Sequence, residues 1–109
     1  MKVVKNVLIA ATIFSASISA NASSKVKYLS VKNDFVYFML EQAKEHSLPS
    51  CVATENSQLW VFELAEKDAD QKLTLLTTAY ASNLSISVES ANACTNTTTI
   101  EKPEAINIG

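Results

Sequence analysis

The chain has 109 residues and a formal net charge of −2, with two cysteines, one histidine and no arginine. A chain this short is expected to form one small domain, and an acidic protein without guanidinium groups is a poor candidate for nucleic-acid binding, which normally uses a basic face. Two cysteines and one histidine also fall short of the four ligands of a structural zinc site, so we expect no metal and no cofactor.

The first 22 residues have the form of a secretory signal peptide. Residues 1–5 are a short basic leader, residues 7–18 are apolar, and Ala20-Asn21-Ala22 has the small-x-small pattern of a cleavage site. The apolar part is shorter than the roughly 20 residues that span a membrane, which disfavours the alternative of an uncleaved anchor helix. We therefore expect cleavage after Ala22 and an exported domain of residues 23–109, periplasmic or secreted, without a membrane span.

A β-hairpin is predicted at the start of the mature chain. Residues 25–31 and 35–40 are rich in β-branched and aromatic side chains, and residues 32–34 between them form a polar turn. In the first strand the apolar positions move from 26 and 28 to 29 and 31, so we expect a bulge near Tyr28. The second strand is apolar on both faces, which is typical of a strand that is covered on both sides.

The next segment, residues 41–58, is mostly polar. Residues 41–46 are helix formers but span only a turn or two, which is too short for a stable helix. We therefore expect a polar extension of the hairpin strand or a loop that ends at Pro49. His46 lies here beside Ser47, but no Gly-x-Ser-x-Gly context is present, and we expect a solvated loop histidine. Residues 51–53 are expected to enter the sheet, and residues 54–58 form another connection.

Residues 59–89 predict a strand, a helix and a second strand. Residues 59–64 are an apolar run, residues 70–82 repeat apolar side chains at helical spacing, and residues 84–89 alternate apolar and polar. Asp68 and Asp70 favour a helix N-terminus at this point of the chain, where acidic side chains interact well with the helix dipole. Asn83 is suited to the left-handed conformation that ends a helix. The far side of the helix carries Lys72 and otherwise small, uncharged side chains. Such a nearly uncharged face suits an oligomer interface, although a surface helix of mediocre propensity is an equal alternative. The expected interface residues are Thr74, Thr77, Thr78 and Ala81.

The C-terminal part predicts one more strand. Residues 90–93 are expected to form a polar hairpin loop, residues 95–100 an exposed or edge segment, and residues 105–108 the final strand after a break at Pro103. Cys51 and Cys94 are expected to pair, because export would place them where disulfides persist. A pair of catalytic or metal-binding thiols is the alternative, which the lack of a Cys-x-x-Cys motif disfavours.

The predicted order of three strands, a helix and two strands is that of the OB-fold, a small Greek-key barrel. Within that fold the sequence resembles the receptor-binding B subunits of five-subunit bacterial toxins of the cholera, heat-labile and subtilase types. The resemblance rests on residues 60–64, Asp68-x-Asp70-Gln71-Lys72, residues 76–81 and 84–88, Cys94 and residues 103–108. The chain also resembles small exported proteobacterial proteins with Pro-x-Cys before strand three, here Pro49-Ser50-Cys51. The toxin family implies a ring of five subunits with the helix lining a pore and a surface that binds host glycans.

From these observations we expect a mainly β (β+α) five-stranded OB-fold-like domain that acts as a non-catalytic, oligomeric binding module for a glycan or a protein surface. Trp60, Tyr37 and Tyr28 are candidate stacking platforms for a sugar ring; the alternative for each is a core or half-buried strand aromatic. A monomeric periplasmic structural or inhibitor-like domain is the alternative function. Catalysis is not expected, because the acidic residues between 63 and 70 are more simply a solvated loop and a helix cap.

Overall fold

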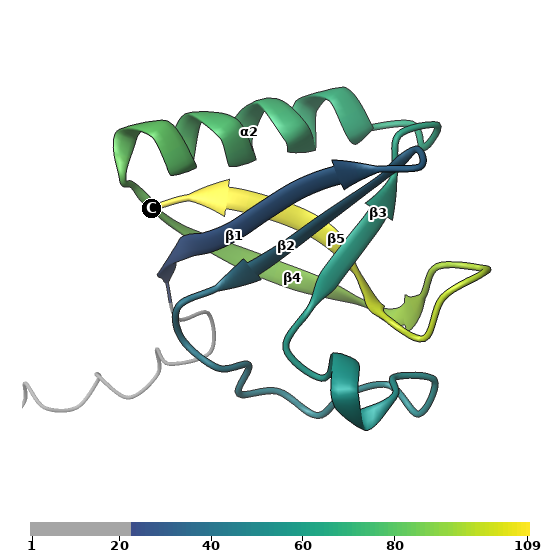
Figure 1. The fold of residues 1–109 in the computed structure, drawn as a ribbon. Coiled ribbons are helices and arrows are strands. Elements are labelled where there is room, and N and C mark those ends of the chain that lie inside the picture. The colour runs from purple at the N-terminus through teal and green to yellow at the C-terminus, as the bar shows by residue number, and fades with distance from the viewer. Residues whose placement is uncertain (1–22) are drawn as a thin grey trace, which may run out of the picture.

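The computed structural model describes residues 23–109, so the signal peptide predicted at residues 1–22 lies outside the described part of the chain. Its strands are β1 (Ser24–Lys32), β2 (Phe35–Leu40), β3 (Trp60–Glu63), β4 (Ser85–Cys94) and β5 (Glu101–Ile108), with α2 (Ala69–Ser82) between β3 and β4 and a short 3-10 helix, η3 (Thr54–Asn56), before β3. The strands close into a barrel in the order β1-β2-β3-β5-β4 (Figure 1). The predicted mainly β, OB-fold-like architecture is confirmed.

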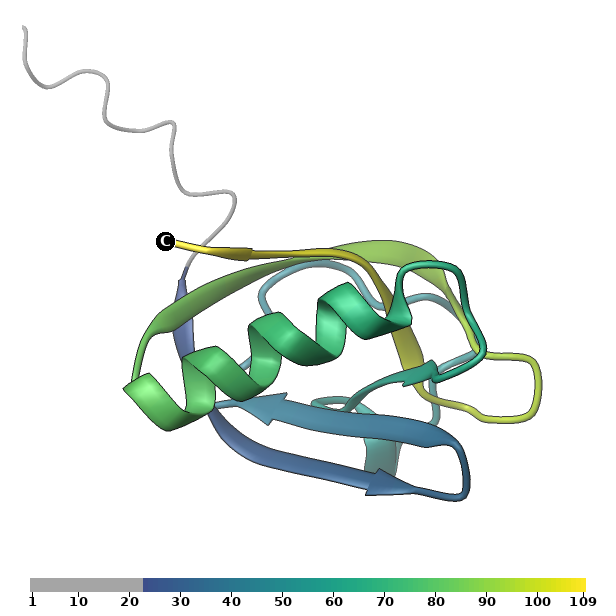
Figure 2. The same cartoon turned by 90° about the horizontal axis from the view of Figure 1, so that it is seen from above.

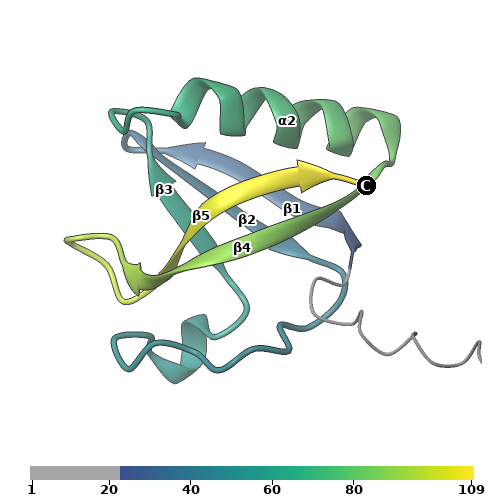
Figure 3. The ribbon, with the colours of Figure 1, turned by 180° about the vertical axis from the view of Figure 1, so that it is seen from behind.

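The two ends of the strand ring are covered differently. Helix α2 lies across one end, and the segment between β2 and β3, which contains η3, lies beneath the other (Figure 3). The core inside the ring is built from strand side chains and the inner face of α2: Val26, Val36, Phe38, Trp60, Phe62, Leu76, Ala79, Ile86 and Ile106. Full burial of a large apolar side chain stabilises by about 1.5–3 kcal/mol, so this core is the main source of stability.

Three local signals behave as the sequence predicts. Asn33 and Asp34 have φ angles of 54° and 68°, as a two-residue type I′ hairpin turn requires, and the pairing of β1 with β2 shifts between Val26 and Tyr28 at the predicted bulge. Asn83 is left-handed, with φ 57°, and ends α2. The Asp68 side chain makes no capping hydrogen bond, although the residue occupies the N-cap position.

The C-terminal predictions need correction. Strand β4 continues to Cys94, so residues 90–93 are not a hairpin loop. Residues 95–100 form turns and bends that are exposed in part, while Thr95 and Ile100 are buried. Strand β5 starts at Glu101 and runs through Pro103, where we predicted a break. Pro103 pairs with Ser90, and the register shifts on both sides of Ser90. Because a bulged ladder leaves some backbone donors unused, it tolerates a residue without an N–H. Residues 51–53 do not form a strand.

Candidate functional site

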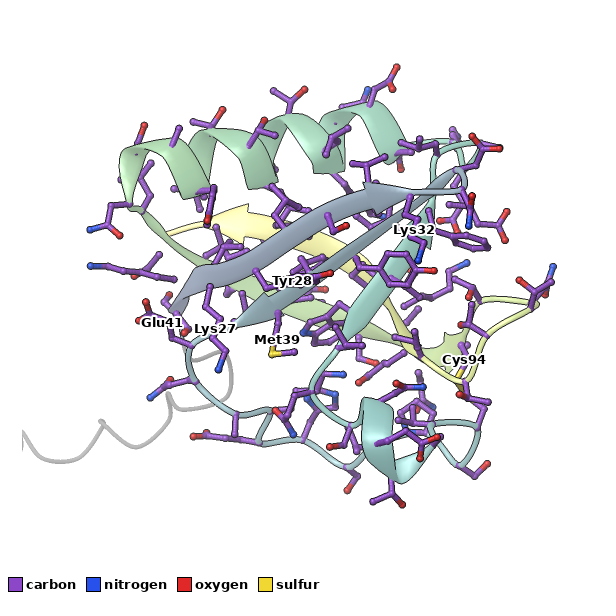
Figure 4. All side chains as sticks on the ribbon, viewed as in Figure 1. Lys27, Tyr28, Lys32, Met39, Glu41 and Cys94 are labelled. Carbon is purple, nitrogen blue, oxygen red and sulfur yellow. A yellow bond between two sulfur atoms is a disulfide. The ribbon has the colours of Figure 1, made fainter. Side chains whose placement is uncertain are left out.

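One face of the β1–β2 hairpin gathers four large apolar side chains on the outside of the ring. Tyr28 pairs with Met39, Ser30 with Tyr37, and Lys32 with Phe35. Directly paired residues of an antiparallel ladder share a face, and side chains alternate along each strand. Tyr28, Phe35, Tyr37 and Met39 therefore lie together, and we call these four residues the hairpin face. Figure 4 labels Tyr28 and Met39.

The hairpin face is partly open to solvent. Tyr28 is 46% exposed, and Phe35, Tyr37 and Met39 are of intermediate burial. The rings of Phe35 and Tyr37 have centroids 6.2 Å apart and are tilted by 49°, so they form one continuous aromatic surface. The face therefore offers flat apolar area outside the core.

The same hairpin is positively charged. Strand β1 contains Lys25, Lys27 and Lys32 and no acidic residue, and Asp34 in the turn is the hairpin's single carboxylate. Lys27 and Lys32 are exposed, and within residues 23–109 none of the three lysines forms an ion pair. The chain as a whole is acidic, but this hairpin is basic. The lysines therefore create a local positive potential beside the hairpin face.

Trp60 lies on the opposite side of the sheet from the hairpin face. It pairs with Phe38, its ring stacks on the Phe38 ring at 6.1 Å and 10°, and it is 2% exposed. The structure therefore brings Tyr28 and Tyr37 to one surface and places Trp60 in the core, where neither ring face is open to a sugar. Its Nε1 has no hydrogen-bond partner among the described residues.

A buried polar cluster that no local pattern in the sequence predicts lies at the end of the ring opposite α2. The Glu101 side chain is fully buried; Lys44 Nζ donates to its Oε1 at 2.8 Å, and His46 Nε2 lies 2.7 Å from its Oε2. The Ser90 hydroxyl donates to the same Oε2. Lys44 Nζ also donates to the Leu59 carbonyl at 2.7 Å. We call Lys44, His46, Ser90 and Glu101 the Glu101 cluster.

Burial and hydrogen bonding act in opposite directions on the charges of the Glu101 cluster. Burial would raise the pKa of Glu101, but the hydrogen bonds from Lys44, Ser90 and His46, together with the Lys44 charge, outweigh it and hold the pKa below its ordinary value. Burial lowers the pKa of Lys44, and the bond to Glu101 opposes this change. The carboxylate is thus kept ionised by its partners.

The arrangement of the Glu101 cluster does not suit nucleophilic catalysis. A Ser-His-acid triad requires the serine hydroxyl to contact the histidine ring, whereas here Ser90 and His46 both contact one oxygen of Glu101. Lys44 is also engaged, because its Nζ lies 4.2 Å from the centroid of the Trp60 ring in addition to its hydrogen bonds. The cluster instead fastens residues 44–46 to β3, β4 and β5.

The Cys51–Cys94 disulfide provides a second attachment for the same segment. The predicted bond is confirmed, with an S–S distance of 2.04 Å and a Cα–Cα distance of 6.2 Å across a sequence separation of 43. It joins the connection between β2 and β3 to the last residue of β4, which Figure 4 labels. The disulfide and the Glu101 cluster therefore hold the cover of this end of the ring in place.

The residues predicted as an oligomer interface lie on the outer face of α2. Thr74, Thr77, Thr78 and Ala81 are all exposed. The Thr77 hydroxyl donates to the Leu73 and Thr74 carbonyls at 3.0 and 3.1 Å, so it is satisfied within its own helix. A shallow groove beside Thr74 is lined by Asp70, Gln71 and Leu75. The interface stays a prediction.

No family model, curated protein or solved structure matches this chain. The resemblance to toxin B subunits therefore stays a prediction from the pattern of elements. In the described range, 23–109, no helix has the length and apolar character needed to cross a membrane. The same residues contain no group of three or more histidine, cysteine or acidic side chains that could hold a metal ion.

Proposed function

We propose that this chain is an exported, non-catalytic binding module that contacts a glycan or a protein surface through the hairpin face. The observation that carries the proposal is the cluster of Tyr28, Phe35, Tyr37 and Met39 on the outside of a ring whose core is already closed. Contiguous apolar side chains at the surface commonly mark interaction sites.

The chemistry of the hairpin face suits a carbohydrate. Tyrosine rings present flat apolar area to the C–H faces of a sugar, and their hydroxyl groups form hydrogen bonds at the rim. Lys27 and Lys32 lie on either side of the part of β1 that contributes to the hairpin face, and their ammonium groups supply further hydrogen-bond donors. OB-folds in general bind oligosaccharides and oligonucleotides on the face of strands 2 and 3 and on the loops after strands 1 and 4. Strand β2 carries three of the four hairpin-face residues, and the acidic character of the chain disfavours an oligonucleotide.

The compartment is part of the proposal. The basic leader, the apolar run and Ala20-Asn21-Ala22 predict export, and the Cys51–Cys94 disulfide is compatible with an oxidising compartment. Assembly into a ring of subunits through the outer face of α2 is the further part of the proposal that rests on the toxin-type resemblance.

A glycan array probed with residues 23–109 tests the glycan form of the proposal. For a glycan that binds, Tyr28→Ala should lower the affinity about tenfold, because aromatic anchors dominate small binding surfaces. The matched control is Tyr80→Ala, which removes a tyrosine of 54% exposure from α2 and should leave the affinity unchanged. Equal affinity of Tyr28→Ala and the wild-type protein would contradict the role of the hairpin face.

The protein form of the proposal needs a different probe. A photo-crosslinking amino acid at position 28, with position 80 as the control, would be introduced into the full chain in an exporting host. A partner captured from position 28 and not from position 80 supports a protein ligand. An array without a glycan ligand, combined with equal capture at both positions, would refute the proposal.

One observation favours the alternative, a monomeric structural or inhibitor-like domain. The outer face of α2 is polar, and the Thr77 hydroxyl is already bonded to its own helix, so the helix needs no partner to satisfy it. Light scattering of residues 23–109 on a sizing column separates the two. A monomer that fails both binding tests would favour this alternative.

A further inference from the structure

Strand β1 has one free edge. It pairs with β2 up to Lys32, but with β4 it pairs only at Ser24 and Lys25. From Lys27 to Lys32, no other strand among the described residues pairs with β1 on the side away from β2. Figure 2 shows this part of β1 at the margin of the molecule, and α2 contacts β1.

The hairpin register identifies the backbone groups at this edge. In a two-residue hairpin the residues that flank the turn, here Lys32 and Phe35, form a hydrogen-bonded pair, and hydrogen-bonded and non-hydrogen-bonded pairs then alternate along the ladder. Ser30 and Tyr28 therefore direct their N–H and C=O groups toward β2. Leu29 and Val31 direct theirs toward the free edge, where an added strand would find two donors and two acceptors.

The side chains beside this edge are accessible and basic. Lys27, Tyr28, Val31 and Lys32 are all exposed, Val31 at 52% and Tyr28 at 46%. The two lysines bracket the free groups of Leu29 and Val31. A strand laid along this edge would therefore meet a positive charge near each of its ends and apolar surface between them.

We propose that the free edge of β1, residues 27–32, binds an extended acidic peptide segment as an added strand. The inference rests on the proposed function and specifies the protein form of it: main-chain hydrogen bonds to Leu29 and Val31 provide affinity, and Lys27 and Lys32 select carboxylate side chains. Six residues of strand span about 20 Å, which is enough for a short linear motif.

A second copy of the same strand is a poor occupant for this edge. Antiparallel pairing of β1 with β1, with Leu29 opposite Val31, would place Lys32 of one copy opposite Tyr28 of the other and within one position of its Lys27. The approach of like charges across a strand pair is unfavourable. Lysines and the bulge at Val26 and Tyr28 are also the features by which edge strands resist indiscriminate pairing. The same lysines leave the edge complementary to an acidic strand.

The test is a nuclear magnetic resonance titration of ¹⁵N-labelled residues 23–109 with a synthetic peptide of alternating glutamate and threonine. We expect the largest amide shifts between positions 27 and 32, and slower hydrogen exchange at the Leu29 and Val31 amides in the complex. Two control peptides carry lysine in place of glutamate, or N-methyl groups on alternate amides, and both should bind at least tenfold more weakly.

Two variants complete the test from the side of the protein. Val31→Pro removes an N–H at the free edge without removing one from the β1–β2 ladder, and it should lower peptide affinity about tenfold relative to the control Val31→Thr. Replacing Lys27 and Lys32 together by glutamine should lower it by a similar factor at low salt. If Val31→Pro does not fold, the N-methylated peptide still decides the matter.

Equal binding of the N-methylated and unmodified peptides, or of the lysine and glutamate peptides, would overturn the inference, as would the absence of binding at millimolar peptide. Protection of amides other than those of Leu29 and Val31 would also overturn it. A glycan or protein ligand that depends on Tyr28 but is indifferent to Val31→Pro would leave the proposed function standing while refuting the added strand. If the wild-type protein binds no glycan, protein or peptide ligand, both the proposed function and the added strand are refuted.

Discussion

Replacing Glu101 by glutamine should destabilise the domain strongly. Glutamine has nearly the same shape, but it is uncharged and leaves the Lys44 ammonium, whose side chain is 4% exposed, without its counter-ion. Removing one partner of a buried ion pair costs about 3–5 kcal/mol. Lys44 keeps its bond to the Leu59 carbonyl, and its pKa is already lowered by burial, so it deprotonates more readily than a solvated lysine. We therefore expect Glu101→Gln to lower the free energy of unfolding by about 3 kcal/mol, the lower end of this range.

A loss of this size is easily measured in a domain this small. Total stabilities of such domains are about 5–10 kcal/mol, and a change of 3 kcal/mol lowers the Tm by about 12–24 °C. Thermal and urea unfolding followed by circular dichroism would measure it. Glu104→Gln is the matched control, because Glu104 is exposed on the same strand and should change stability by less than about 0.5 kcal/mol. A Tm for Glu101→Gln within about 3 °C of that of Glu104→Gln would refute the reasoning.

The pH dependence gives the same prediction a second check. Burial would raise the pKa of Glu101, but its hydrogen bonds outweigh burial, and the pKa in the folded state lies below that in the unfolded state. The stabilisation is therefore fully present above the unfolded value of about 4.3 and is lost as the pH falls through the folded value. The difference in Tm between the wild-type protein and Glu101→Gln should shrink below about pH 4. A difference that stays constant down to about pH 2 would contradict the assigned pKa direction.

Two further predictions concern the disulfide and the helix. Cys94→Ser should cost about 4 kcal/mol in the chain-entropy model for a loop of this length, and a Tm change of only a few degrees by calorimetry would contradict a main stabilising role for the bond. If the outer face of α2 is an oligomer interface, Thr74→Lys should reduce the solution mass measured by light scattering and leave far-ultraviolet circular dichroism unchanged. Thr74 is a cleaner position than Thr77, whose hydroxyl bonds to its own helix. An unchanged oligomer mass in Thr74→Lys would exclude this face.

Local signals in the sequence predict most of the fold. The turn at Asn33 and Asp34, the bulge near Tyr28 and the left-handed Asn83 depend on residues that are adjacent in the chain, and the structure has all three. The break predicted at Pro103 failed for the opposite reason. Whether a strand tolerates proline depends on what lies beside it, and the irregular pairing with Ser90 cannot be inferred from residues 101–108 alone.

The candidate surface could be predicted only in part. Tyr28 and Tyr37 are aromatic residues of predicted strands, but whether they share a face depends on the register between β1 and β2, which a one-residue slip would reverse. Trp60 has the same local character, yet its register with Phe38 places it in the core. The Glu101 cluster carried no local signal, because Lys44 and Glu101 are separated by 57 positions in the chain.

By itself the sequence determined the leader-like first segment, the order and type of the elements, and the two cysteines able to pair, because these depend on composition, periodicity and short-range backbone preferences. Only the tertiary structure decided which aromatic side chains reach the surface, that a buried carboxylate fastens the segment between β2 and β3, and that β1 keeps a free edge. Each of these depends on strand pairing between distant parts of the chain, and pairing is fixed by the total burial of the ring rather than by any single stretch of residues.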